Sequence, residues 1–311
     1  MERVVLGHAE QWISVRGESP EKPLLLFVHG GPGSAMTPWL GRFAPNLSAR
    51  FTVVSWDQRG AGKSWRAIEP RDDMTVDRLV EDTIELGRLL GPRSAAGKVV
   101  VVGHSFGSML AILAASRDPA LFESLVAVAP VISAPENDRR SWEQTLETAR
   151  ARGVERAVSD LEDAGPPPYD PRHLFERSFV LLAWAERFAA DKTGPSPFRS
   201  SSLVALAEST EYEAADRSNY WHAYQTSYEI LQPQLAAVDL RERVTRLDLP
   251  VTLALGRHDA STIPELAEQW LDSLDAPRKD LVWFERSGHA PLFEEPEKFE
   301  GLLWRIAGRS V

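Results

Sequence analysis

The chain contains 311 residues, which exceeds the roughly 100–200 residues of a typical domain and predicts either one large core with an insertion or two domains. Hydrophobic residues make up 43% and charged residues 26%, a balance typical of globular proteins that excludes an intrinsically disordered chain. The formal net charge of −10 argues against nucleic acid or an anionic membrane as a partner, and the absence of cysteine excludes disulfides, thiolate metal ligands and a cysteine nucleophile.

The first 15 residues carry charged side chains at Glu2, Arg3 and Glu10, which interrupt any apolar run of the kind found in signal peptides. The longest apolar runs elsewhere are far shorter than the about 20 residues that span a bilayer. The sequence therefore predicts a cytoplasmic protein without a membrane partner.

Short apolar runs alternate with helical patterns in the N-terminal half. Thr75 precedes apolar positions that recur at helical spacing, and Gly91-Pro92 would end that helix. The apolar runs contain few polar residues, as strands do when helices cover both faces of their sheet. The pattern predicts an α/β fold with a mostly parallel, doubly wound sheet, whose first strands lie at residues 24–28, 51–56, 98–102 and 124–129.

The alternation stops between residues 133 and 238, where the sequence is typical of helices with aromatic stripes. It resumes with strands at 251–255 and 281–284, and with helices at 263–274 and 297–307. We therefore predict a core formed by residues 1–132 and 239–311, interrupted by a helical cap at 133–238.

The run Gly103-His104-Ser105-Phe106-Gly107 matches the G-x-S-x-G nucleophile elbow. It follows an apolar strand and precedes a helical pattern, which is the context that this motif requires. The glycines leave room for a strained turn that exposes the serine hydroxyl at the carboxyl edge of the sheet. Ser105 is the predicted nucleophile, and an ordinary Gly-Ser turn is the alternative.

A serine hydroxyl is a weak nucleophile at neutral pH and needs a base that is itself oriented by a carboxylate. Asp259 follows the strand at 251–255, and His289 follows the strand at 281–284. The order Ser, Asp, His is the one that this architecture uses. We assign His289 as general base and then acid, and Asp259 as its partner; Glu136 is the alternative acid.

The run His29-Gly30-Gly31-Pro32-Gly33 follows the first predicted strand, where this architecture supplies an oxyanion-hole donor. The predicted donors are the backbone amides of Gly31 and Phe106. Gly30 and His104 stand beside these groups and are candidate substrate-binding residues.

Two other kinds of site are not predicted. The run from Gly60 to Ser64 ends like a phosphate-binding loop, but Asp57 stands where the first glycine of that motif is required. No spacing of His, Asp or Glu suggests a metal site. We therefore expect neither a nucleotide nor a metal cofactor.

With the elbow, the His-Gly-Gly-Pro-Gly run and Asp57-Gln58-Arg59-Gly60-Ala61-Gly62-Lys63-Ser64, the chain resembles the proline iminopeptidase family of α/β-hydrolases. The resemblance covers nearly the whole sequence, including residues 287–296. It implies an α/β-hydrolase fold and an enzyme that removes N-terminal proline or another small residue without a metal. It also implies cap carboxylates that bind the substrate's free amino group; Glu229 matches best, and the other candidates are Glu208, Glu211 and Glu213.

The leading hypothesis is therefore an aminopeptidase-like amidase acting on a small molecule or short peptide with a free amino group. An esterase or lactonase would need the same three catalytic groups but no amine-binding carboxylate. A catalytically silent binding protein is a third hypothesis, since this fold also serves as a scaffold for binding.

Overall fold

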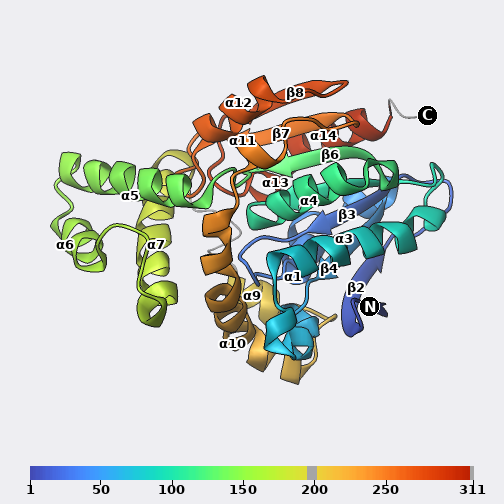
Figure 1. Ribbon diagram of the computed structural model, residues 1–311, viewed down its shortest axis with the longest axis horizontal. Coiled ribbons are helices and arrows are strands. Elements are labelled where there is room, and N and C mark those ends of the chain that lie inside the picture. The colour runs from blue at the N-terminus through green and yellow to red at the C-terminus, as the bar shows by residue number, and fades with distance from the viewer. Residues whose placement is uncertain (195–201, 309–311) are drawn as a thin grey trace.

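The computed structural model describes residues 1–194 and 202–308, which form one eight-stranded sheet with helices on both sides (Figure 1). The sheet order is β1-β2-β4-β3-β5-β6-β7-β8. β1 pairs with β2, and β2 with β4, in antiparallel orientation. The other five pairings in the sheet are parallel. The strands are β1 (Glu2–Leu6), β2 (Ala9–Arg16), β3 (Leu24–Val28), β4 (Thr52–Asp57), β5 (Val99–His104), β6 (Phe122–Val128), β7 (Val251–Gly256) and β8 (Lys279–Phe284).

The predicted fold class is confirmed, and the predicted strand ends differ from the observed ones by at most about two residues. The hairpin of β1 and β2 was not predicted. Gly7 and His8 connect these strands with φ angles of 50° and 65°, as a two-residue hairpin turn requires. The core helices are α1 (Thr37–Phe43), α2 (Leu47–Arg50), α3 (Val76–Leu90), α4 (Phe106–Arg117), α11 (Leu240–Arg243), α12 (Pro264–Ser273), α13 (Pro291–Glu294) and α14 (Pro296–Ala307).

Two apolar clusters fill the two faces of the sheet because successive side chains of a strand point to opposite sides. Leu24, Leu26 and Val28 of β3 pack in the cluster that contains α3, α4 and α12. Leu25 and Phe27 pack in the cluster that contains α1 and α14. All five side chains of β3 are buried, as expected for a central strand covered on both sides.

A group of helices lies between β6 and β7 in the chain, which we call the inserted helices: α5 (Ala134–Ala151), α6 (Glu155–Ala164), α7 (Leu174–Thr193), α9 (Ser202–Glu208) and α10 (Ala214–Leu231). An isolated bridge pairs Ser133 with Asp239 where the chain leaves and re-enters the sheet layer. α5, α6 and α7 project away from the sheet, at the left of Figure 1, and pack around their own apolar cluster.

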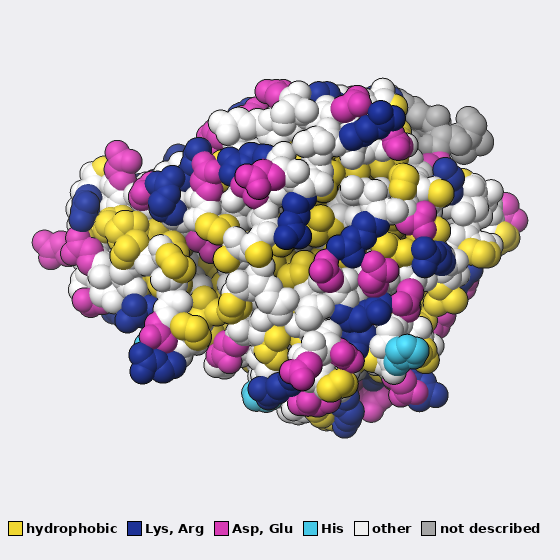
Figure 2. All heavy atoms as spheres, viewed as in Figure 1, with side chains coloured by type: hydrophobic (Ala, Val, Ile, Leu, Met, Phe, Trp, Pro, Cys, Tyr) yellow, Lys and Arg dark blue, Asp and Glu magenta, His cyan; other side chains and the backbone are white. Residues whose placement is uncertain are grey.

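The surface is of mixed charge. Acidic and basic side chains are interspersed over the face seen in Figure 2. Within residues 1–194 and 202–308, no helix combines the length and the apolarity needed to cross a membrane.

Candidate active site

The nucleophile elbow forms the tight turn between β5 and α4. Ser105 has φ 54° and ψ −124°, a backbone conformation that residues other than glycine rarely adopt. Its N–H donates to the Val128 carbonyl at 2.9 Å. A Cβ atom on Gly103 would lie 2.5 Å from the Cα of Ser108, and one on Gly107 would overlap the carbonyl of Val28. Both glycines of the motif are therefore required by close backbone packing.

The loops after β7 and β8 bring Asp259 and His289 together. Gly256 pairs with Phe284 at the ends of these strands, and a Cβ on Gly256 would overlap the carbonyl of Gly288, so the loops run in direct contact. The Nδ1 atom of His289 lies 2.9 Å from Oδ2 of Asp259. This hydrogen bond orients the imidazole and leaves Nε2 as its remaining nitrogen.

Asp259 is held as an anion. Its Oδ1 accepts hydrogen bonds from the backbone N–H groups of Ser261 and Thr262 at 2.8 and 2.9 Å, and the Thr262 hydroxyl donates to Oδ2 at 2.6 Å. Burial alone would raise the pKa of Asp259, but the nearby His289 ring and these hydrogen bonds lower it overall. The carboxylate can therefore stabilise a positive charge on His289.

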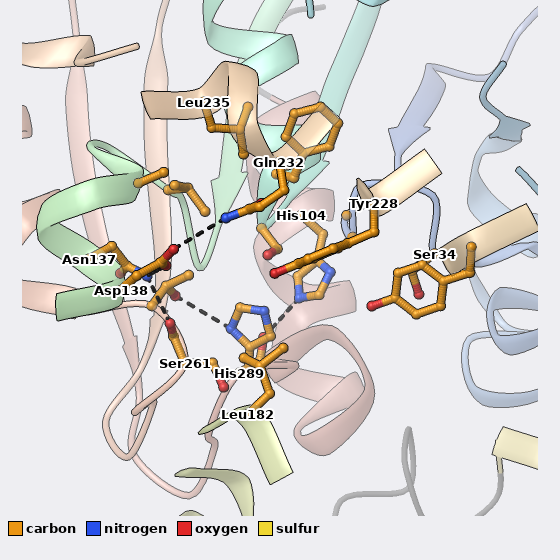
Figure 3. A pocket seen from close by; sticks show the side chains of 18 of the residues that line it. Ser34, His104, Asn137, Asp138, Leu182, Tyr228, Gln232, Leu235, Ser261 and His289 are labelled. Atoms are coloured by element: carbon orange, nitrogen blue, oxygen red, sulfur yellow. Dashed lines mark hydrogen bonds between the residues drawn. The ribbon is translucent and has the colours of Figure 1, made fainter. Parts of the chain in front are cut away.

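Ser105 and His289 line the same cavity, which has a volume of about 120 Å³. Ligand pockets commonly measure about 300–1,000 Å³, so this one suits a small substrate group. Its walls come from both the sheet edge and the inserted helices (Figure 3), and apolar or aromatic members include Val131, Leu182, Tyr224, Tyr228 and Leu235.

The two predicted oxyanion-hole residues also line this cavity, together with Gly30. Gly30 lies against the nucleophile, because a Cβ on it would be 2.9 Å from the Cβ of Ser105. Gly31 has φ 116°, which favours glycine. Phe106 is the first residue of α4, where a backbone N–H has no acceptor within the helix.

His104 lines the cavity beside the nucleophile and contacts His289. Its Nε2 donates to the His289 carbonyl at 2.8 Å, and the two ring centroids are 4.9 Å apart. Burial, and then the proximity of His289, lower the pKa of His104 to about 3, so its ring is neutral near pH 7. His104 is therefore a neutral contact of His289, the predicted general base.

The glutamates suggested by the family resemblance lie elsewhere. Glu229 is exposed on α10, where it accepts a hydrogen bond from Gln225 at 2.8 Å, and it is not among the residues that line the cavity. Three further glutamates of the inserted segment also lie outside the cavity and pair with basic residues of the core: Glu208 with Arg42, Glu211 with Arg16, and Glu213 with Lys63.

The alternative acid, Glu136, pairs with Arg140 and Arg241 and does not line the cavity. Within the described residues, no group of three or more His, Cys, Asp or Glu side chains is arranged to hold a metal ion.

The Asp57–Ser64 motif has a structural role. Gln58 donates through its side chain to the His29 carbonyl at 2.7 Å, and its N–H donates to His29 Nε2 at 3.1 Å. Arg59 and Asp82 form a buried salt bridge at 3.1 Å. Lys63, the residue that resembled a phosphate ligand, binds Asp216 at 2.8 Å. Gln58 therefore holds His29 at the start of the glycine-rich loop, while Arg59 and Lys63 form ion pairs with other segments.

Sequence reasoning missed two acidic residues of the cavity wall, Asp138 on α5 and Glu186 on α7. The Asp138 carboxylate accepts hydrogen bonds from the Gln232 side chain at 3.2 Å and from the Asn137 side chain at 3.3 Å. Burial raises the pKa of Asp138 to about 6. One sequence signal could have identified Asp138: it lies near the start of the helix that follows β6. That strand ends at the same edge of the sheet as the loops that carry Asp259 and His289.

Comparison with known proteins supports the α/β-hydrolase fold. A family model described as alpha/beta hydrolase fold matches residues 23–296. The chain belongs to this family. Its sequence is 28% identical to that of the probable aminopeptidase YbaC of Bacillus subtilis (strain 168), over 99% of this chain and 96% of that one.

The sequence is also 26% identical to that of a proline iminopeptidase of Heyndrickxia coagulans, over 90% of this chain and 88% of that one. Among solved structures, a proline iminopeptidase-related protein from Thermus thermophilus superposes with a TM-score of 0.68 at 24% identity, covering 100% of this chain and 98% of that one. The predicted resemblance to proline iminopeptidases is confirmed.

Proposed function

We propose that this hydrolase-fold protein is a serine aminopeptidase or amidase that releases a small N-terminal residue. The observation that carries the proposal is the placement of Ser105 and of the hydrogen-bonded pair His289 and Asp259 around one small cavity. The names of the relatives, a probable aminopeptidase and a proline iminopeptidase, favour an amide with a free amino group as the substrate.

In the proposed reaction, His289 Nε2 takes the proton of the Ser105 hydroxyl as Oγ attacks the substrate carbonyl carbon. The Gly31 and Phe106 amides stabilise the resulting oxyanion, and Asp259 stabilises the imidazolium. The C–N bond then breaks as His289 gives its proton to the leaving amine. Water, activated by the same histidine, hydrolyses the acyl-enzyme and restores Ser105.

An esterase would use these same groups, so the substrate class must be tested directly. We would measure hydrolysis of proline and alanine 4-nitroanilides, of their N-acetylated forms and of 4-nitrophenyl propanoate. The proposal expects turnover of the free-amine anilides and little turnover of the acetylated ones. Turnover of esters alone would support an esterase.

Replacement of the nucleophile tests the catalytic assignment. Ser105→Ala should lower kcat for every substrate by at least about 1,000-fold, because the hydroxyl that forms the acyl-enzyme is removed. The exposed elbow should keep its fold, which circular dichroism and the unfolding midpoint would check. Retention of wild-type activity would refute the assignment.

A further inference from the structure

Two carboxylates of the cavity wall, Asp138 and Glu186, are not used by the proposed reaction. Asp138 lies on α5, and Figure 3 shows it facing Gln232. Its two side-chain hydrogen bonds come from neutral amides, and their lengths of 3.2 and 3.3 Å are at the long end for N–H···O bonds. Within the described residues, no Lys, Arg or His forms a salt bridge with it.

In this environment, two hydrogen bonds from neutral amides only partly offset the free-energy cost of removing the Asp138 carboxylate from water. A carboxylate has about four acceptor positions, and an ion removed from water is costly unless a cation or several strong donors balance it. Burial raises the pKa of Asp138 to about 6, which reflects that cost, yet the group is still largely ionised near pH 7. A cationic ligand group in the cavity would supply the missing charge.

Aromatic side chains complete the surroundings of this carboxylate. Tyr228 also lines the cavity. Burial raises the pKa of the Tyr228 hydroxyl, and the negative charge of Asp138 raises it further, because the two groups lie close together. An ammonium group gains from both an anion and an adjacent aromatic ring. The site therefore matches a primary or secondary ammonium in charge and in size.

We propose that Asp138 binds the protonated amino group of the substrate and so selects free-amine substrates. This inference rests on the proposed function, and it assigns the amine contact to α5 in place of the exposed Glu229 of α10. Because Asp138, Ser105 and His289 share one small cavity, an amine held by Asp138 would place a nearby carbonyl against the nucleophile. N-acylation removes the positive charge and adds bulk at this carboxylate, so it should abolish binding.

The sharpest test compares two inhibitors that differ only in the amino group. L-Alaninamide is cationic near neutral pH, whereas propanamide lacks the amino group and its charge. Each would be titrated as a competitive inhibitor of 4-nitrophenyl propanoate hydrolysis at pH 7. In the wild type, alaninamide should bind more tightly than propanamide by about 10- to 100-fold, the usual effect of a hydrogen-bonded charge pair.

Asp138→Asn keeps the shape of the side chain and removes its charge, so it should reduce that preference to within about threefold. Asp138→Ser is a second variant in case the new amide packs poorly. Glu143→Gln removes an exposed carboxylate from the same helix and should leave both inhibition constants unchanged. Glu229→Gln and Glu186→Gln test the competing carboxylates.

The outcomes separate this inference from the proposed function. A wild-type enzyme that cleaves alanine 4-nitroanilide, with an amine preference unchanged in Asp138→Asn, would overturn the inference alone. The inference would also fail if Glu229→Gln or Glu186→Gln, and not Asp138→Asn, removed the preference. A wild-type enzyme that cleaves only esters would overturn the aminopeptidase proposal, whereas the inhibitor comparison would still decide whether Asp138 binds amines.

Discussion

His104 is a neutral side chain in direct contact with His289, the proposed general base. Its Nε2 donates to the main-chain carbonyl of His289, and its ring packs on the His289 ring. Because its pKa is lowered to about 3, it carries no charge in the working pH range. It can therefore affect catalysis through geometry and not through its own titration.

His104→Phe keeps the aromatic packing and removes the hydrogen bond to the His289 carbonyl. We expect it to lower kcat by roughly 10- to 100-fold, because displacement of a catalytic group by a fraction of an ångström is costly. His104→Gln, which retains an N–H donor, should recover most of the loss. The check is the pH profile of kcat/KM: its acidic limb should keep the wild-type midpoint in both variants, and a shifted limb would mean that His104 itself transfers protons.

The sequence suffices to propose three catalytic residues because motif, chain order and strand ends all point to the same edge of the sheet. Ser105 stands in a motif whose glycines are needed for backbone contacts, and His289 and Asp259 follow successive strands. Asp138 belongs to no motif and is followed by two arginines, so the sequence alone resembles a solvated helix face. Only the packing of α5 over the sheet edge places it in the cavity.

The end of β4 and the segment before α10 are joined by a buried polar contact. The Tyr212 hydroxyl donates to Oδ2 of Asp57 at 2.6 Å, the Thr37 hydroxyl donates to Oδ1 at 2.7 Å, and the Lys63 N–H donates to Oδ2 at 2.8 Å. Burial raises the pKa of Asp57 to about 6 despite these donors. Each donor therefore compensates a desolvated carboxylate, and the Tyr212 hydroxyl also ties the inserted segment to the core.

Tyr212→Phe removes one of these donors and leaves a buried acceptor less satisfied. We expect the free energy of unfolding to fall by about 1–3 kcal/mol, measured by urea denaturation at pH 7.5. Tyr169→Phe is the matched control, because the Tyr169 hydroxyl is buried and has no hydrogen-bond partner in the part of the chain that the structure describes. Its removal should cost nothing, so equal losses in both variants would contradict the role of the Asp57 contact.

Elements were predictable where their patterns were strong. β3 and β5 are continuous apolar runs and α3 has a threonine cap, so these elements were identified from sequence alone. β1 and β2 lie at the edge of the sheet, where the apolar Val5 occupies an exposed position and charged side chains interrupt the apolar pattern of both strands. The order of the strands depends on crossovers, which no local pattern records.

At the scale of the whole molecule, the proposed amine site opposes stability. A carboxylate whose pKa is raised on folding binds its proton more tightly in the folded state than in the unfolded state. Asp138 therefore costs most stability when it is ionised, above its folded pKa of about 6, and this cost disappears as the pH falls below the unfolded value of about 3.8. Retaining such a group fits a role in binding, since sites commonly carry charges that the fold alone would not favour.

Asp138→Asn should consequently raise the free energy of unfolding relative to the wild type, and the gain should depend on pH. Between about pH 4 and pH 6 the wild type loses stability with rising pH, because the Asp138 carboxyl ionises in the unfolded state while it stays protonated in the folded state; the amide variant has no such loss. From a raised pKa of about 6, the gain at pH 8 should exceed the gain at pH 5 by about 1 kcal/mol. Urea denaturation of both proteins at the two pH values measures this difference, with Glu143→Gln as the control that should show no pH-dependent gain. A gain that is equal at pH 5 and pH 8 would mean that Asp138 is not the desolvated anion on which its proposed binding of an ammonium group depends.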